Sequence, residues 1–319
     1  MTWIIGAFLL LLGVAAAWMT QPMPLVSRRP DAGPRPDPKR IERRVRELVE
    51  RFHPRDGGHP ENMRRAAAWI AEELGRAGAA VSEQEVLAEG ARYVNVVAAF
   101  GPATADVVAV GAHYDVAGEM PGADDNASGV GGLLEVADLL READLSRRVE
   151  LVAFANEEAP YFATPGMGSD VYARSLVAAR RRVRGMICLE MLGCFTDAPG
   201  SQKLPFGVLR LFYPSTGNFI AVVGNLPGAG IVRRVKRSMR EASDLPVESI
   251  NAPALVPGVD LSDHSSFWRR GLPAVMITDT AFYRNPRYHT ENDTPDTLDY
   301  VRMAEVVAGV RRAVLSLAR

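Results

Sequence analysis

The chain of 319 residues has only two cysteines, Cys188 and Cys194. Both lie in an apolar segment, one on each side of Glu190, where a disulfide would close a short loop inside a predicted core strand. We therefore interpret them as two buried thiols. Two such cysteines do not identify the redox compartment of the protein.

The chain also lacks an excess of charge of either sign and any internal repeat. Its formal net charge is −1 at pH 7, which gives no electrostatic reason to expect nucleic acid as a partner. No self-similarity is found at solenoid or propeller spacing. Apolar residues, in contrast, are plentiful: 47% of the chain is hydrophobic and 24% is charged, enough for a well-buried core.

The longest apolar run is at the N-terminus, where residues 3–19 read WIIGAFLLLLGVAAAWM without a charge. At about 1.5 Å per residue, such a helix spans about 25 Å, slightly less than a bilayer core. Trp3 and Trp18 stand at its two ends, where interfacial aromatic residues are expected. We therefore predict that residues 1–20 form an uncleaved hydrophobic helix that anchors the protein in a membrane.

Two observations leave the processing and topology of this segment open. Ala15, Ala16 and Ala17 are small residues of the kind found at signal-peptide cleavage sites, so a secreted or periplasmic protein is the alternative. No Lys or Arg precedes the segment, whereas Arg28 and Arg29 follow it. The positive-inside rule then favours a cytoplasmic C-terminal side, which conflicts with our expectation that the folded domain lies on the exported side.

The rest of the chain divides into a linker and one folded domain. Residues 21–38 contain six prolines, which predicts an extended linker over residues 21–39 and a folded domain over residues 40–319. Apolar periodicity predicts helices over residues 40–52, 62–77, 130–142 and 299–318. Short β-branched or apolar runs predict strands over residues 93–100, 106–112, 149–155, 186–189, 209–213 and 274–278.

This alternation of strands and helices predicts an α/β fold. Continuous apolar strands are typical of a mixed, largely parallel central sheet that helices cover on both faces, in three layers. In such sheets, ligand sites collect at the carboxyl ends of the strands. Polar motifs of this chain follow several predicted strands directly.

Three of these motifs lie in the first half of the chain. The run GAHYD (residues 111–115) ends a strand, and side chains two apart on a strand point the same way, so Asp115 can orient His113. The run PGADDNASG (121–129) leads into a helix, and alone it is typical of a turn with an N-cap. The run NEE (156–158) is either a solvated strand edge or a pair with Glu157 as general base and Glu158 as ligand.

Two further motifs follow. In LEM (189–191), Glu190 closes an apolar strand, and a buried carboxylate needs a partner or a metal ion. The run NPRYHT (285–290) contains His289, one of only five histidines in the chain. Taken alone, His289 is equally consistent with a surface histidine.

In their order and spacing, these five runs resemble the zinc exopeptidase family that includes the secreted bacterial leucyl aminopeptidase, glutamate carboxypeptidase and glutaminyl cyclase. The resemblance covers roughly residues 45–319. It implies the three-layer fold of that family and a zinc-dependent aminopeptidase that hydrolyses the N-terminal peptide bond of a peptide substrate. It does not indicate an oligomeric state.

The resemblance also implies a role for each motif residue. His113 and Glu190 would hold one Zn²⁺, Glu158 and His289 would hold a second, and Asp125 would bridge the two. Asp124 matches an acidic neighbour that is not a ligand. Glu157 would be the general base, and Asp115 would be the outer partner of His113.

Three other activities remain as alternatives. Related metallo-carboxypeptidases and deacylases usually insert a dimerisation domain between the last two ligand segments, whereas the 99 positions from Glu190 to His289 can be filled by strands of one sheet. A glutaminyl cyclase would use one zinc, and the full two-metal set argues against it. A non-catalytic ectodomain of the same fold would have lost ligands that are all present here.

The run PGVDLSDH (257–264) departs from the leucyl aminopeptidase pattern. The cysteine and tyrosine expected before Ser262, Asp263 and His264 are absent, which leaves the oxyanion-stabilising group open. These three residues are candidates for either the pocket wall or a supporting loop. Apolar runs at residues 160–169 and 212–214 are expected to shape the specificity pocket and to favour hydrophobic N-terminal residues.

Overall fold

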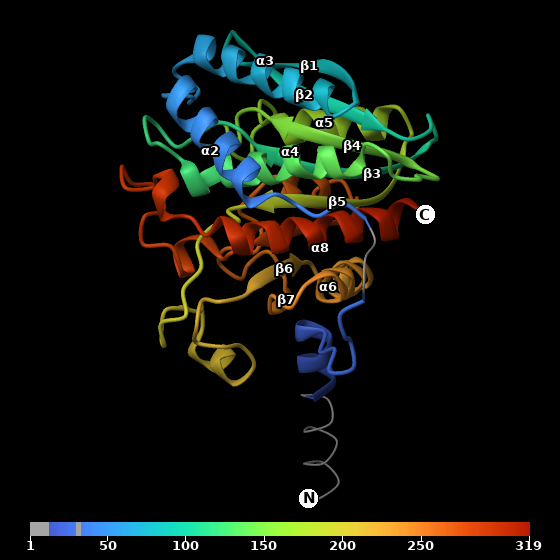
Figure 1. Cartoon of the computed structure of the whole chain (residues 1–319), viewed down its shortest axis with the longest axis vertical. Helices are drawn as coiled ribbons and strands as arrows, with labels where there is room; N and C mark the ends of the chain where they lie inside the picture. Colours follow the sequence, from blue (N-terminus) through green and yellow to red (C-terminus); the bar gives the residue numbers. More distant parts are fainter. Residues whose placement is uncertain (1–12, 30–32) are drawn as a thin grey trace, which may run out of the picture.

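The computed structural model describes residues 13–29 and 33–319. A mixed eight-stranded sheet crosses the domain in the order β1-β2-β4-β3-β5-β8-β6-β7 (Figure 1). The central strands β4, β3, β5 and β8 are parallel. At one edge β1 pairs antiparallel with β2 and β2 with β4, and at the other edge β6 pairs antiparallel with β8 and parallel with β7. The strands are β1 (Ala80–Ala88), β2 (Ala91–Phe100), β3 (Asp106–His113), β4 (Arg148–Phe154), β5 (Arg182–Glu190), β6 (Ile220–Gly224), β7 (Val247–Asn251) and β8 (Ala274–Thr278).

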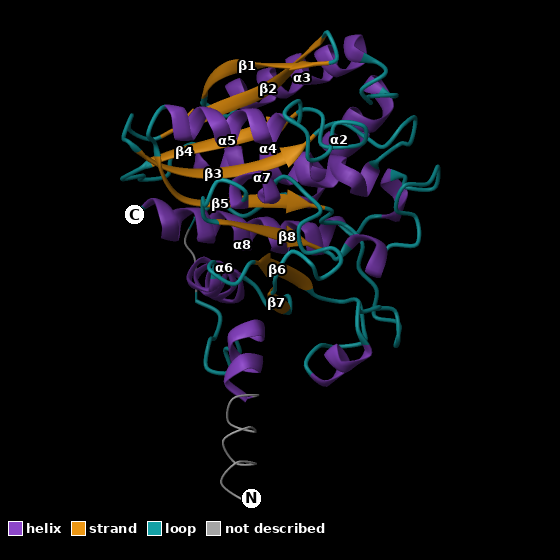
Figure 2. Ribbon diagram, turned by 180° about the vertical axis from the view of Figure 1, so that it is seen from behind, coloured by secondary structure: helices purple, strands orange, loops and turns teal. Residues whose placement is uncertain are grey.

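Helices cover both faces of the sheet, which explains why every residue of β3 is buried. Val108 and Val110 pack on one face and Ala109 on the other, so alternate strand residues supply two separate cores. Figures 1 and 2 show the molecule from opposite sides. The first core includes α2 (Pro38–Phe52), α3 (Pro60–Arg76), α4 (Gly129–Leu140), α6 (Ala229–Ala242) and α8 (Tyr300–Ala318), and the second includes α5 (Gly168–Ala178) and α7 (His264–Trp268).

This arrangement confirms the predicted α/β domain with a mixed sheet between helices. The predicted strand at residues 209–213 is wrong, because that segment lies in a loop that contains the 3₁₀ helix η2 (Gly207–Leu211). The segment packs beside the sheet without joining it: Tyr213 Oη donates a hydrogen bond to the carbonyl oxygen of Ser249 on β7, while Leu211 is 79% exposed. The strand that pairs with β8 at this edge is β6.

The N-terminal segment contacts the edge of the sheet formed by β7. Residues 13–20 are helical, and the carbonyl oxygen of Thr20 accepts hydrogen bonds from Lys236 Nζ (2.9 Å) and Ser249 Oγ (2.7 Å). Among the described residues, no helix has the length and apolar character needed to cross a membrane. More than half of the predicted anchor, residues 1–12, lies outside the described part of the chain.

Candidate active site

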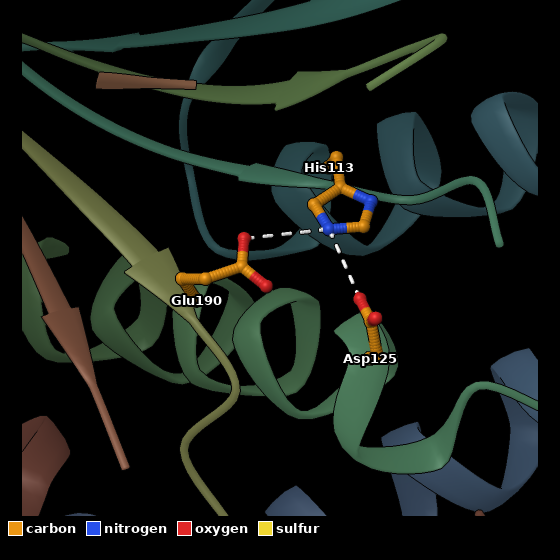
Figure 3. Close-up of side chains that lie close together, drawn as sticks. All are labelled: His113, Asp125 and Glu190. Atoms are coloured by element: carbon orange, nitrogen blue, oxygen red, sulfur yellow. Dashed lines mark ion pairs between the residues drawn. The ribbon is translucent and has the colours of Figure 1, made fainter. Parts of the chain in front are cut away.

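The carboxyl ends of β3 and β5 bring His113 and Glu190 together, and the loop before α4 adds Asp125. His113 Nε2 lies 3.3 Å from Asp125 Oδ1 and 3.4 Å from Glu190 Oε2 (Figure 3). His113 Nε2 and Asp125 Oδ1 are buried without a hydrogen-bond partner among the described residues. Buried polar atoms are rarely left without a partner. One imidazole and two carboxylates are ligands typical of a zinc site, so a cation could supply the missing partner of this first triad.

A second triad shares Asp125 with the first. His289 Nε2 lies 3.1 Å from Asp125 Oδ2 and 3.3 Å from Glu158 Oε1. Each carboxylate oxygen of Asp125 therefore faces a different histidine, and the two groups each satisfy the spacing of metal ligands. The His113 side chain is 1% exposed and that of His289 is 37% exposed, so the second triad is the one open to solvent.

The pKa values of these groups are shifted because several carboxylates are buried close together. Burial raises the pKa of Glu157 and of Glu190, and raises that of Glu158 to about 7. Burial alone would lower the pKa of His289, but its hydrogen bonds to Asp125 and Glu158 raise it to about 10. In the metal-free protein, protons thus supply positive charge that a divalent cation could supply instead.

Asp115 connects the ends of β3 and β4. Its carboxylate oxygens accept hydrogen bonds from the backbone N–H groups of Glu157 (3.1 Å) and Glu158 (3.0 Å). His113 Nδ1 lies 3.2 Å from the backbone oxygen of Asp115 and 3.5 Å from its Oδ1. Since β3 ends at His113, the contact arises from the turn after the strand and not from strand alternation. Asp115 therefore positions three motif residues at once.

Asn126 attaches the loop before α4 to the end of β5, a role that sequence reasoning missed. Its Nδ2 donates to the carbonyl oxygen of Leu189 (2.9 Å), and its Oδ1 accepts from the N–H groups of Met191 and Gly129 (3.1 Å each). The partners Leu189 and Met191 are the two sequence neighbours of Glu190, while the bond from Gly129 lies at the start of α4. An asparagine next to an acidic pair was the only available signal.

The two adjacent aspartates of this loop point to different partners. Asp124 accepts hydrogen bonds from Gly193 N (2.9 Å) and Asn285 Nδ2 (2.8 Å), away from both triads. Asp293 accepts from the backbone N–H groups of Asp124 and Asp125, which fixes the loop. Asp125 is therefore the residue of the pair that faces the two histidines, and Asp293 is a further supporting residue that sequence reasoning missed.

Three residues in the motif segments have a left-handed backbone. Asn156 (φ 59°) directly precedes Glu157, and Met191 (φ 52°) directly follows Glu190. The third residue, His289 (φ 55°), is itself a member of the second triad. Such conformations are uncommon for residues other than glycine and cluster at functional sites. They turn the chain sharply where the strands end, so that neighbouring side chains face the same space.

Of the three candidates at residues 262–264, where α7 begins, only Ser262 is bonded to a motif side chain. Its Oγ donates to Glu190 Oε2 at 2.6 Å. His264 is fully buried and its Nε2 donates to the carbonyl oxygen of Val259 at 2.8 Å. Burial lowers the pKa of His264 to about 4, so the ring is neutral at pH 7. Asp263 is also fully buried, and both of its carboxylate oxygens lack a hydrogen-bond partner among the described residues.

An apolar cavity of about 120 Å³ opens beside Glu190. Tyr288 also lines it, and its ring stacks on that of His289 with centroids 3.8 Å apart. Of the two runs expected to shape the specificity pocket, residues 160–169 and 212–214, Tyr213 alone is among the described residues that line this cavity. The rest of the apolar wall includes Leu209 and Met276, from segments predicted as strands, Val259, from the run of residues 257–264, and Phe219 and Ala221, from a segment that the sequence did not single out.

Known proteins are similar to this chain in sequence and in fold. The chain is 44% identical over 315 residues to the uncharacterized protein YfbL of Escherichia coli (strain K12), covering 96% of this chain and 97% of that one. It is 25% identical over 266 residues to a protein named "Probable leucine aminopeptidase 1" of Trichophyton verrucosum (strain HKI 0517), covering 76% of this chain and 64% of that one.

Two solved structures show the same fold. BSAP, a zinc aminopeptidase from Bacillus subtilis, has a TM-score of 0.68 at 15% identity and covers 87% of this chain and 94% of its own. A glutaminyl cyclase from Porphyromonas gingivalis has a TM-score of 0.65 at 22% identity and covers 87% and 97%. The family model described as "Peptidase family M28" matches residues 95–314, which include every motif residue of the two triads. The chain therefore belongs to peptidase family M28.

Proposed function

We propose that the protein is an aminopeptidase with two Zn²⁺ ions, one held by His113 and Glu190, the other by Glu158 and His289, with Asp125 between them. The observation that carries the proposal is the placement of Asp125, whose two oxygens each face one buried or half-buried histidine. Imidazole and carboxylate ligands without thiolate are typical of catalytic zinc that keeps an open position. The zinc aminopeptidase named above has the same fold.

Glu157 is the proposed general base. It belongs to neither triad, yet its Oε2 lies 3.9 Å from His113 Nε2, so its carboxylate faces the same space as the ligands. Burial raises its pKa, which strengthens it as a proton acceptor. When bound, zinc would polarise the peptide carbonyl and acidify a water molecule. Glu157 would accept the proton of that water and pass it to the leaving amine.

The phenol of Tyr288 is the proposed donor to the oxyanion. Its side chain lines the cavity next to Glu190, and burial, together with the carboxylates of the site, raises its pKa, so it keeps its proton. A hydroxyl donor at this place can stabilise negative charge that develops on the carbonyl oxygen. The free α-amino group of the substrate would pair with the neighbouring acidic side chains, which accounts for attack at the first residue.

The cavity supports a preference for apolar N-terminal residues. Its volume is close to that of an engineered apolar cavity of about 150 Å³ that binds benzene. A side chain of the size of leucine fits such a space, and the wall offers apolar contact from Leu209, Phe219 and Met276. The fungal relative carries the name of a leucine aminopeptidase, which agrees with this choice.

A panel of aminoacyl-anilides, assayed with and without a chelator, tests the proposal. We expect leucine, methionine and phenylalanine anilides to be hydrolysed and acidic ones to be poor substrates. A chelator should abolish turnover, and added Zn²⁺ should restore it. Turnover that survives complete metal removal, or a preference for acidic or basic residues, would contradict the proposal.

The rival activities have less support. Between Glu190 and His289, the chain forms β6, α6, β7, α7 and β8 within the one domain, without an inserted dimerisation domain of the kind found in related carboxypeptidases and deacylases. Bound metal in the purified protein separates a catalytic protein from a non-catalytic ectodomain.

We also propose that residues 1–20 anchor the protein in a membrane, since the run of residues 3–19 is uncharged.

A further inference from the structure

The loop of residues 203–213 has two different faces. The residues of this loop that line the cavity are Lys203, Leu204, Pro205, Leu209 and Tyr213. The other large apolar side chains of the loop do not line it and are exposed to solvent, with Leu211 79% exposed. We call these four residues the η2 patch: Phe206, Val208, Leu211 and Phe212. Contiguous exposed apolar side chains usually mark an interaction surface, and binding in the cavity does not account for them.

The N-terminal segment reaches the domain next to this loop. The carbonyl oxygen of Ser249, on β7, accepts a hydrogen bond from Tyr213 Oη (2.8 Å), while Ser249 Oγ donates to the carbonyl oxygen of Thr20 (2.7 Å). One residue thus connects the η2 loop with the segment that follows the apolar run. Both views place η2 and residues 13–20 at the same end of the molecule, beyond β7 (Figures 1 and 2).

The attachment of the N-terminal segment is specific. Lys236 Nζ donates to the carbonyl oxygen of Thr20 (2.9 Å), Asn251 Nδ2 to that of Trp18 (2.9 Å), and Arg240 to that of Met23 (2.6 Å). Side-chain donors from α6 and β7 therefore hold residues 18–23 against the domain. An anchor that continues from this segment would fix which end of the domain faces the bilayer.

The charge of the η2 loop is also consistent with contact to a lipid bilayer. Lys203 and Arg210 are the only charged residues among residues 203–213, and both are positive. Basic side chains interleaved with exposed apolar ones are typical of segments that lie in the interface of a membrane with anionic lipids. A protein partner would not require that this patch lie beside the apolar N-terminus.

We infer that the η2 patch rests in the headgroup region of a lipid bilayer and holds the mouth of the cavity close to the membrane surface. This inference rests on the proposed anchoring by residues 1–20 and does not depend on the peptidase chemistry. Lys203 and Arg210 contact the anionic headgroups, and the four apolar side chains lie at the boundary with the acyl chains.

A fluorophore at one position of the patch tests this contact in the full chain. Leu211→Cys is labelled with an environment-sensitive dye and reconstituted in vesicles of phosphatidylethanolamine and phosphatidylglycerol that contain nitroxide-labelled lipid. Cys188 and Cys194 are buried, so the dye reacts at the new cysteine. The matched control is Leu87→Cys. Leu87 is 63% exposed and lies on β1, at the edge of the sheet opposite to β7.

We expect a blue-shifted emission and several-fold stronger quenching by the nitroxide lipid at position 211 than at position 87. Equal, weak quenching at both positions in protein that floats with the vesicles would overturn the patch contact and leave the anchor standing. Protein that does not float would overturn both. A blue shift that appears without lipid and grows with protein concentration would assign the patch to a second copy of the chain, against our inference.

Hydrolysis of leucine anilide by both labelled proteins is measured separately. Equal turnover shows that both variants fold. If neither variant nor the parent chain hydrolyses the anilide, the proposed peptidase function fails, while the quenching comparison between positions 211 and 87 still decides the membrane contact.

Discussion

Two regions meet at Glu190, and they are built in opposite ways. On one side lie buried acidic and histidine side chains, and backbone N–H groups just after β4 and β5 donate hydrogen bonds to the supporting side chains of Asp115 and Asn126. On the other side, the cavity is apolar and is bounded by β6, β8 and loops. We call them the acidic cluster and the cavity. If the first performs the chemistry and the second selects the substrate, substitutions in each should change different kinetic constants.

The largest effect is expected from Glu157→Gln. The amide keeps the size of the side chain but cannot accept a proton, so kcat should fall by about 10²–10⁴-fold. Zinc content should stay the same, because Glu157 belongs to neither triad. Steady-state kinetics together with metal analysis by mass spectrometry test this. If zinc is lost along with activity, Glu157 is a ligand and its assignment as base is wrong.

Within the acidic cluster, His113→Ala and His289→Ala should differ in the metal-free protein. The carboxylates of Glu190 and Glu157 raise the pKa of His113 against the effect of burial, so its loss leaves buried carboxylates unpaired. Breaking such a buried pair costs about 3–5 kcal/mol. His289 is partly exposed, and its removal should cost about 1 kcal/mol or less. Urea unfolding in the presence of a chelator at pH 7 measures both.

Equal stability losses in these two variants would remove the distinction between a closed and an open triad. Both variants should lose zinc, and this second measurement separates a metal ligand from a residue that only stabilises the fold.

The segment of residues 257–264 joins the two regions, because Ser262 donates to Glu190 and Val259 lines the cavity, and the stability of the protein should depend on pH through His264. Burial lowers the pKa of His264 from 6.5 to about 4. The unfolded chain therefore binds a proton more tightly in this range, and the contribution of the neutral ring is lost as pH falls from 6.5 to 4. The loss amounts to about 3 kcal/mol. Urea unfolding at pH 7 and pH 5 should show a shallower pH dependence in His264→Asn, and the control His53→Asn, at an exposed position, should behave like the parent chain.

The sequence allowed most of the acidic cluster to be located, and little of the cavity. His113, Glu158 and Glu190 are polar residues at or just after the ends of long apolar strands, where the alternation of strands and helices already places ligand sites. Phe219 and Ala221, in contrast, precede or lie in β6, a five-residue strand without a polar motif. The η2 loop has the apolar composition of a strand but lies outside the sheet, so local pattern alone was misleading.

The hydrogen-bonded supports of the cluster were also not predicted. Asn126 lies in a run that is typical of a helix cap, and its actual partners on β5 are more than 60 positions away. Contacts of that separation depend on the order of strands in the sheet, which the chain does not encode in any short run.

The smallest effect, and the sharpest test of the cavity, is expected from Ala221→Leu. Ala221 lines the cavity, so the larger side chain should occupy the space for the substrate residue. We expect kcat/KM for leucine anilide to fall by about 10–100-fold while alanine anilide is spared, since one or a few methylenes in a pocket contribute about 1–3 kcal/mol. The control Ala103→Leu, in the exposed turn before β3, should leave both substrates unchanged. An equal loss for leucine and alanine anilides, with zinc content intact, would show that the cavity does not select the substrate and that the division between the two regions is wrong.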